Sequence, residues 1–173
     1  HSVTEEISKI KKQIEVLVNS LEALQKKTVW ILPNNDPGSS LIRDKVLSAK
    51  SENNLIFENF NRLEFLTIMK NSIAIVGNSS AGIIEAPSFK IGTINIGDRQ
   101  RGRIKAGSVI DCKPDFKDIK RALKLLFSIK FKRSLNRVVN PHGKGGASQK
   151  IFKVLKKFQL NNVLKKRFYD IGP

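Results

Sequence analysis

The segment Gly77–Arg103, with the sequence GNSSAGIIEAPSFKIGTINIGDRQRGR, decides the fold of this chain. The apolar run Ile73–Val76 leads into it and predicts a strand, and Gly92–Ile96 predicts the next strand. A tight turn and a short helix, limited by Pro87, separate the two. Strands that alternate with helices in this way indicate an α/β fold with a parallel sheet. Sheets of this kind bind ligands beyond the carboxyl ends of their strands.

The turn after the first of these strands has the composition of an anion site. Ser79 and Ser80 stand where the helix is expected to begin, and Gly82 follows. A helix start offers free backbone N–H groups and the positive end of the helix dipole, to which the two hydroxyls add donors. The same serines would also serve as plain helix caps. The pattern alone therefore leaves both interpretations open.

Two charged side chains near this turn suit a nucleotide. The carboxylate of Glu85, expected about one and a half turns into the helix, can accept two hydrogen bonds from a ribose diol. Glutamate is also a common surface residue near a helix start. The planar guanidinium of Arg99 matches phosphate oxygens, whereas Arg101 and Arg103 are expected to be solvated.

The rest of the chain continues the alternation of helices and strands. Helices are predicted at about 5–26, 40–50, 63–69, 115–129 and 147–158, and strands at 28–32, 54–57, 73–76, 92–96 and 108–111. The strand at 28–32 is apolar throughout, which is typical of a strand buried on both faces. The last two helices are expected to turn inward Ala122, Leu125, Leu126 and Ile129, and Ile151, Val154, Leu155 and Phe158. The segment 140–146 is predicted to be a flexible loop.

Charge is distributed unevenly along the 173 residues, which carry a net charge of +17. Residues 1–98 hold 11 basic and 11 acidic side chains, and residues 99–173 hold 21 and 4. This excess indicates a solvated basic face, and it is compatible with a field that attracts phosphates. A nucleic-acid-binding module is the less favoured alternative, because only 7% of residues are aromatic and no RNA-binding aromatic motif occurs.

The remaining features narrow the class of protein. The single cysteine, Cys112, excludes an internal disulfide and is expected to be a small buried residue. The sequence shows no metal-ligand cluster, no apolar run of membrane-spanning length and no signal peptide. A cytoplasmic protein without membrane or nucleic-acid partners is expected. Because the chain starts at His1 without a methionine, we also expect it to be a fragment of a longer protein.

The central segment resembles the hydrolysing UDP-N-acetylglucosamine 2-epimerases, including those of bacterial sialic- and legionaminic-acid synthesis. The residues that carry the resemblance are Gly77-Asn78-Ser79-Ser80-x-Gly82, Glu85 and Asn95-Ile96-Gly97-x-Arg99-Gln100-x-Gly102-Arg103. Two further stretches match in order: His1-x-Val3-Thr4, with Ser2 in place of the family's proline, and Pro33-Asn34-x-Asp36-x-Gly38. The resemblance covers most of residues 1–157.

The resemblance implies a fold and an activity. The chain would be the C-terminal half of a GT-B-type two-domain fold, with a Rossmann-like parallel sheet and helices on both faces. Residues 1–173 would form one nucleotide-binding domain with a basic tail at 158–173. The complete enzyme would convert a UDP-2-acetamido sugar to UDP and the free 2-epimer, such as N-acetylmannosamine, by elimination and then hydration. The family's acid/base carboxylates lie in the N-terminal half, so this chain alone is predicted to be inactive.

The resemblance also implies site residues and partners. The substrate-binding residues would be Asn34, Asp36, Phe60, Ser79, Ser80, Gly82, Glu85 and Arg99. His1 is the catalytic candidate, acting at the diphosphate and sugar, provided that a strand precedes it. The partners would be the UDP-sugar, the N-terminal domain and, when complete, further copies of the same protein; no cofactor or metal is implied. The donor domain of a GT-B glycosyltransferase is the alternative with the same architecture.

Overall fold

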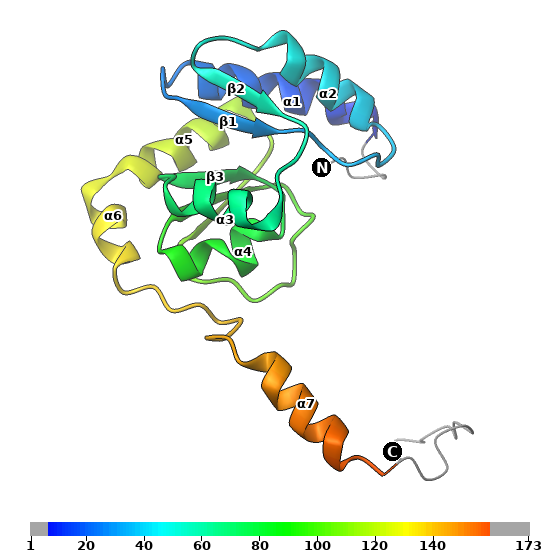
Figure 1. The fold of residues 1–173 in the computed structure, drawn as a ribbon. Helices are drawn as coiled ribbons and strands as arrows, with labels where there is room; N and C mark the ends of the chain where they lie inside the picture. Colours follow the sequence, from blue (N-terminus) through cyan, green and yellow to red (C-terminus); the bar gives the residue numbers. More distant parts are fainter. Residues whose placement is uncertain (1–6, 160–173) are drawn as a thin grey trace, which may run out of the picture. The chain divides into compact units, whose positions relative to one another are not determined.

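The computed structural model describes residues 7–159 (Figure 1). The chain divides into two units, one ending at His142 and one beginning at Gly143, and each is described by itself. The first unit contains α1 (Ile7–Glu22), β1 (Thr28–Ile31), α2 (Ser39–Ser48), β2 (Asn54–Phe57), α3 (Arg62–Lys70), β3 (Ala74–Gly77), α4 (Ala81–Ile84), the 3-10 helix η2 (Ala86–Phe89), β4 (Gly92–Ile96), β5 (Val109–Cys112), α5 (Phe116–Phe127) and α6 (Ile129–Leu135). The second unit contains α7 (Ala147–Lys157).

All strand pairs within the described residues 7–159 are parallel, which confirms the α/β class with parallel strands. The strands are divided between two sheets, with β1 beside β2 in one and the order β3-β4-β5 in the other. Gly77 at the end of β3 lies opposite Asn95 of β4, and Asn95 lies opposite Asp111 of β5. Figure 1 shows β1, β2 and β3 pointing in the same direction. The carboxyl ends of these strands therefore lie on one side of the unit.

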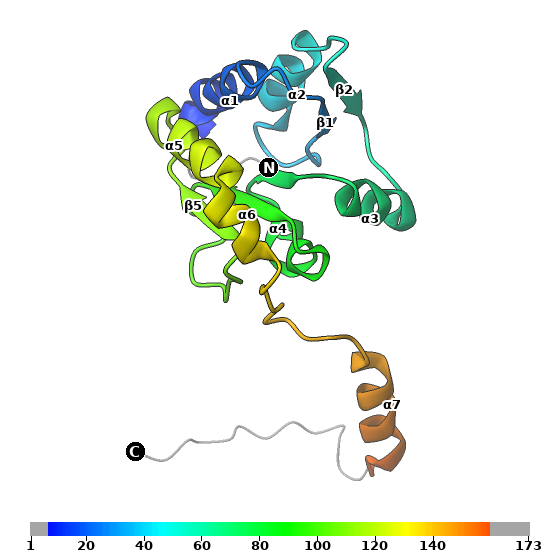
Figure 2. The same ribbon diagram turned by 90° about the vertical axis from the view of Figure 1, so that its left-hand side faces the viewer.

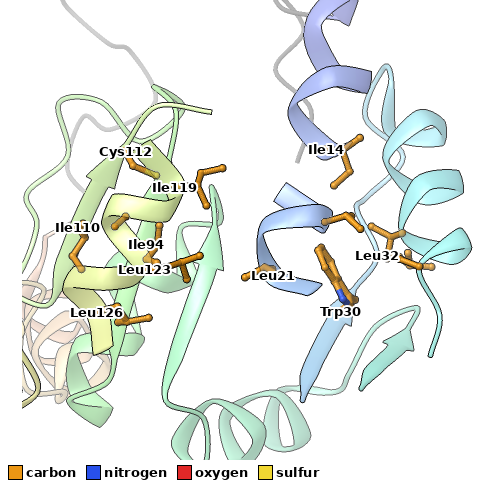
Figure 3. Packing of buried hydrophobic residues seen from close by; sticks show 14 of the residues in the cluster. Ile14, Leu21, Trp30, Leu32, Ile94, Ile110, Cys112, Ile119, Leu123 and Leu126 are labelled. Carbon is orange, nitrogen blue, oxygen red and sulfur yellow. The ribbon is translucent and has the colours of Figure 1, made fainter. Parts of the chain in front are cut away.

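Helices cover both faces of the sheets. The buried side chains Ile10, Ile14, Val18 and Leu21 recur every three or four residues of α1 and therefore form one face. In Figure 3 several of them lie in one core with Trp30 and with residues of β4, β5 and α5. A second cluster joins Met69 of α3 to residues near α4 and η2. Figure 2 shows α1 beside α5, with α3 on the other side of the unit.

β1 is buried on one face only, contrary to the sequence prediction. Trp30 lies in the core, and its indole Nε1 donates to Asn54 Oδ1 at 3.2 Å. Val29 and Ile31 point to the other face and are 39% and 42% exposed. Their side chains alternate with Trp30 because successive residues of a strand point to opposite faces. The expected burial of both faces was therefore wrong.

The predicted helix at 115–129 is two helices. Asp115 caps α5, because its carboxylate accepts a hydrogen bond from Asp118 N at 2.9 Å. Ser128, however, has extended backbone angles and accepts a hydrogen bond from Phe131 N at 3.2 Å, so that it ends α5 and caps α6. The prediction that Leu125 and Ile129 face inward was wrong, since they are 42% and 70% exposed. The buried side chains of α5 are Ile119, Ala122, Leu123 and Leu126.

Smaller differences occur elsewhere. The first helix ends at Glu22 rather than near residue 26, and Gln25 follows it with a positive φ of 50°. The loop at 140–146 was predicted to be flexible, but Asn140 Nδ2 donates to Ile84 O at 2.8 Å and to Ser88 Oγ at 2.7 Å. The first part of this loop is therefore fixed to the first unit.

The second unit contains the predicted helix near the C-terminus. α7 ends one residue earlier than predicted, but its apolar side chains are not buried: Ile151, Val154, Leu155 and Phe158 are 58–66% exposed. Within residues 7–159, no helix combines the length and the apolar character that crossing a membrane requires.

Candidate functional site

The turn after β3 and the loop after β4 leave the same edge of the sheet. The pairing of Gly77 with Asn95 places them there, and two hydrogen bonds join them. Arg99 Nη1 donates to Asn78 O at 3.1 Å, and Gln100 Nε2 donates to the same oxygen at 2.8 Å. The structure thus brings the arginine that we singled out to the turn that contains the two serines.

The serine turn is compact and partly buried. Gly77 has a φ of 141°, a conformation that side chains disfavour, and it starts the turn. Ser79 Oγ accepts a hydrogen bond from Ala81 N at 3.3 Å, so this hydroxyl does cap the chain locally. Ser80 precedes α4 and makes no capping bond with its side chain. The Ser80 hydroxyl is therefore the better placed of the two to bind a ligand.

The helix that follows is shorter than the sequence suggested. α4 has four residues, and Glu85 stands where it ends and η2 begins. Pro87 explains this end, because it lacks the N–H that would continue the α-helical bonding to the carbonyl of Ile83. The expectation that Glu85 lies one and a half turns into a helix was wrong. A single turn also contributes little dipole, so the donors that this turn offers to an anion are hydroxyl and guanidinium groups.

Glu85 has an unpaired polar atom. Its side chain is partly buried, and the buried Oε2 has no hydrogen-bond partner among the described residues. A buried carboxylate oxygen without a donor is costly in free energy, since it has lost water and gained nothing in return. A ligand that supplies hydroxyl donors would remove that cost.

Gly82 has a packing role. A Cβ atom at this position would lie 2.6 Å from Thr93 Cγ2 and 3.2 Å from Ile75 Cγ2. The hydroxyl of Thr93 donates to Gly82 O at 2.7 Å. The absence of a side chain therefore lets α4 lie directly on β4, which fixes the position of the serine turn.

The other predicted residues lie in the loops after β1 and β2. Asn34 is exposed, and Asp36 is half-buried and accepts a bond from Ser39 N at its backbone oxygen, at 2.9 Å. The ring of Phe60 packs on that of Phe57, with ring centroids 4.7 Å apart. Among the described residues, no hydrogen bond joins Asn34 or Phe60 to the serine turn. His1 lies outside the described residues.

The loop before α3, next to Phe60, has a defined geometry. Asn61 follows Phe60 directly and caps α3. Its Oδ1 accepts from Glu64 N at 2.9 Å, while Glu64 Oε2 accepts from Asn61 N at 3.0 Å. This reciprocal capping box fixes the end of the loop.

Further polar residues stabilise the edge of the sheet at the ends of β3 and β4. Sequence reasoning did not single them out. Gln100 is only 1% exposed, and one of its two polar atoms holds Asn78. In the sequence, only the position of Gln100 inside the motif shared with the epimerases pointed to a role for this residue. Asn95 Nδ2 donates to Asp111 Oδ1 at 2.7 Å, and Lys105 Nζ contacts both oxygens of that carboxylate at 2.8 and 2.9 Å.

The surroundings of Asp111 and Cys112 shift the pKa values of both side chains. Burial raises the pKa of the Asp111 carboxyl, but the hydrogen bonds from Lys105 and Asn95 and the charge of Lys105 outweigh it, so that the pKa lies below its ordinary value. Burial and the nearby charge of Asp118 raise the pKa of the Cys112 thiol to about 12. Cys112 is buried and protonated at neutral pH, which confirms its expected role as a small core residue.

A cleft of about 330 Å³ lies next to this edge, beyond β4 and β5. Its lining includes Arg101, Lys105 and Lys113 together with Asp98 and Asp118. None of the predicted substrate-binding residues lines this cleft. The candidate site is therefore the serine turn with Glu85 and Arg99, outside this cleft.

Known proteins with similar sequences belong to one family of nucleotide-sugar enzymes. The family described as UDP-N-acetylglucosamine 2-epimerase matches residues 1–156. The GDP/UDP-N,N'-diacetylbacillosamine 2-epimerase (hydrolyzing) of Campylobacter jejuni is 33% identical over 99% of this chain and 45% of its own length. The UDP-N,N'-diacetylbacillosamine 2-epimerase (hydrolyzing) of Legionella pneumophila is 32% identical over 94% of this chain and 42% of its own length.

A solved structure shows the same fold. UDP-GlcNAc 2-epimerase from Neisseria meningitidis, bound to UDP-GlcNAc, superposes with a TM-score of 0.69 at 24% identity, over 85% of this chain and 41% of that one. This similarity supports the GT-B type of fold that the resemblance implied. The chain spans less than half the length of the relatives it matches, as expected for the C-terminal half. By its sequence match and its fold, the chain belongs to the UDP-N-acetylglucosamine 2-epimerase family.

Proposed function

We propose that this chain is the UDP-binding half of a hydrolysing 2-epimerase that acts on a UDP-2-acetamido sugar. The observation that carries the proposal is the unpaired Oε2 of Glu85, beside a turn that Arg99 contacts through Asn78. Donors for phosphate and an acceptor for hydroxyls thus lie at one edge of the sheet. The relatives named above as hydrolysing enzymes, and the UDP-GlcNAc in the Neisseria structure, support this choice of ligand.

Each residue has a defined task in this proposal. Arg99 and the hydroxyls of Ser79 and Ser80 bind the diphosphate, because charged and hydroxyl donors match its oxygens. Glu85 accepts hydrogen bonds from the ribose diol, the neutral part of UDP that a carboxylate can hold. Gly82 lets the turn approach β4. Three loop residues complete the substrate-binding set: Phe60 beside the uracil, and Asn34 and Asp36 at the border of the substrate.

The chemistry divides between this half and the rest of a longer protein. UDP is eliminated from the sugar, and water then adds to the resulting double bond to give the free 2-epimer. Donors held in place at the diphosphate stabilise the charge that develops as UDP departs. His1 acts at the diphosphate and sugar. The carboxylates that move the proton at C2 belong to the N-terminal half, so this chain binds UDP without turning over the sugar.

The proposal extends to the setting of the protein. Residues 1–173 form the nucleotide-binding domain, with a basic tail at 158–173, and the N-terminal domain of the same protein closes over the substrate. The complete enzyme is a homo-oligomer in the cytoplasm. Relatives that act on UDP-N,N'-diacetylbacillosamine and on UDP-N-acetylglucosamine support a UDP-2-acetamido sugar of either kind as the substrate. A glycosyltransferase transfers its sugar to an acceptor. Release of UDP and free sugar in the absence of an acceptor would therefore distinguish a 2-epimerase from a glycosyltransferase.

Calorimetric titration of a Glu85→Gln variant tests the proposal. The amide keeps the size of the side chain and one acceptor, so we expect the affinity for UDP to fall by about 1–2 kcal/mol while the fold is retained. Affinity for 2',3'-dideoxy-UDP should hardly change, because that ligand has no diol to lose. The exposed Glu52, changed to Gln, serves as the control. If Glu85→Gln weakens both ligands equally, Glu85 does not bind the ribose.

A further inference from the structure

The segment 136–142, which follows α6, contacts the elements that carry the candidate site. Lys90 Nζ, just after η2, donates to Asn136 O at 3.0 Å. At the other end of the segment, His142 Nε2 lies 3.1 Å from Ile104 O, in the loop after β4. The segment therefore touches both stretches of chain that form the site, α4 with η2 and the loop after β4.

Asn140 makes the central contact of this segment, and each polar atom of its amide has a partner. Its Nδ2 donates to Ile84 O at 2.8 Å and to Ser88 Oγ at 2.7 Å. Its Oδ1 accepts from His142 N at 2.9 Å. Because a backbone N–H can only donate, the oxygen of the amide must face His142 and the nitrogen must face Ile84. The amide is therefore fixed in one orientation, with its donors directed at residues 56 and 52 positions earlier in the chain.

The carbonyl of Ile84 needs this donor. It ends α4, where a continuing helix would supply an N–H from the next turn. Pro87 has no N–H, and Ser88 N donates to Glu85 O at 3.0 Å instead. Asn140 thus supplies the hydrogen bond that the break between α4 and η2 removes.

Glu85 stands at this break. Its N–H donates to Ala81 O at 3.1 Å, and its carbonyl accepts from Ser88 N. Ile84 O belongs to the same planar peptide unit as Glu85 N, so the bond from Asn140 fixes the plane from which the Glu85 side chain extends. That side chain ends in the carboxylate with the buried, unpaired Oε2. The direction of the carboxylate therefore depends on the peptide plane that Asn140 holds.

We propose that Asn140 is a positioning residue for ribose recognition, which acts by fixing the peptide plane before Glu85. The inference rests on the proposed function, in which Glu85 accepts hydrogen bonds from the ribose diol. A carboxylate that binds two hydroxyls at once tolerates little displacement, because hydrogen bonds weaken steeply as their geometry departs from linear. The diphosphate donors, Ser80 and Arg99, do not depend on the Ile84 carbonyl in this way. Loss of the Asn140 amide should therefore affect the ribose contact of UDP selectively.

Two variants of Asn140 in the full 173-residue chain, titrated with UDP and with 2',3'-dideoxy-UDP, test the inference. Asn140→Ala removes the whole amide. Asn140→Asp keeps the size of the side chain and the acceptor for His142 N but offers no donor to Ile84 O, so it also serves if the alanine variant does not fold. Its added charge would repel both ligands alike, so the readout is the ratio of the two affinities.

His142→Ala is the matched control. It releases the same segment from Ile104 and retains the backbone N–H that Asn140 accepts. Circular dichroism checks the fold of each variant. A change that only loosened the segment would therefore appear in His142→Ala as well.

Each Asn140 variant should lower the ratio of UDP affinity to dideoxy-UDP affinity by about fivefold, the factor expected for one lost hydrogen bond. His142→Ala should leave that ratio unchanged. In a chain that already has Glu85→Gln, Asn140→Ala should lower the ratio much less, because the group through which it acts has been replaced.

An equal loss for both ligands in the uncharged Asn140→Ala variant would overturn the inference, since Asn140 would then only hold the site together. An equally large change of the ratio in His142→Ala would also overturn it. If Glu85→Gln changes the ratio and the Asn140 variants do not, the inference fails and the proposed function stands. If Glu85→Gln itself leaves the ratio unchanged, the ribose assignment of the proposed function fails, and the inference fails with it.

Discussion

At the scale of single residues, Arg99 is the side chain on which the proposed phosphate binding is expected to depend most. Its guanidinium contacts the serine turn, whereas Arg101 lies further along the exposed loop. Arg99→Ala should weaken UDP binding by about 1.5–3 kcal/mol, the usual range for a hydrogen bond to a charged group. Gln100 holds the same carbonyl of Asn78, so the turn should keep its place and the loss should reflect the ligand contact.

Arg101→Ala is the matched control for this titration. It removes the same charge from the same loop, so any general field effect is equal in both variants. If the two substitutions cost the same affinity, Arg99 acts only through its charge and the direct contact with phosphate does not exist.

The sequence suggested the residues of the candidate site by their types, but it did not show which groups each side chain contacts. The two serines, Glu85 and Arg99 were proposed from strand ends, from the chemistry of diphosphate and ribose, and from the family resemblance. Gln100 was missed because a buried glutamine has no periodic signal, and only the three-dimensional turn shows what it holds. The unpaired oxygen of Glu85 likewise depends on burial, which adjacent residues alone do not determine.

At the scale of elements, the contact of α4 with β4 fixes the site. Gly82→Ala would place a Cβ 2.6 Å from Thr93 Cγ2, so the helix or the Thr93 side chain must shift. We expect a loss of about 1–3 kcal/mol in the free energy of unfolding, typical of overpacking, together with weaker UDP binding. Denaturant unfolding of the variant measures the loss.

Adding Thr93→Ser to Gly82→Ala provides the check. Serine removes the clashing methyl group and keeps the hydroxyl that donates to Gly82 O. Part of the lost stability should return in the double variant relative to Thr93→Ser alone. Strictly additive losses would show that the two residues do not interact.

The elements themselves were largely predictable, and the misses have identifiable causes. Apolar runs located the five strands of the described part of the chain within one residue, because a parallel strand needs such a run. The break at Ser128 was missed because a cap inside a continuous helical pattern depends on one side-chain hydrogen bond. The helix at Glu85 was predicted too long because the effect of Pro87 on the preceding turn was underestimated.

At the scale of the whole molecule, the basic second part of the sequence should assist ligand capture. Residues 99–173 carry 21 basic and 4 acidic side chains. Exposed charges are screened over about 10 Å at 0.1 M salt, so UDP affinity should fall as sodium chloride is raised. Neutral uridine is the control ligand, and its affinity should not follow the salt. Salt-independent binding of UDP would exclude a steering role for this charge.

The central claim is that UDP binds at the edge formed by the ends of β3 and β4. Amide exchange measured along the whole chain, with and without saturating UDP, tests this most directly. The account predicts that protection concentrates in Gly77–Glu85 and Gly97–Arg103, which hold the serine turn, Glu85 and Arg99. Protection confined to the lysine-rich helix α7, or binding that protects neither segment, would contradict the account.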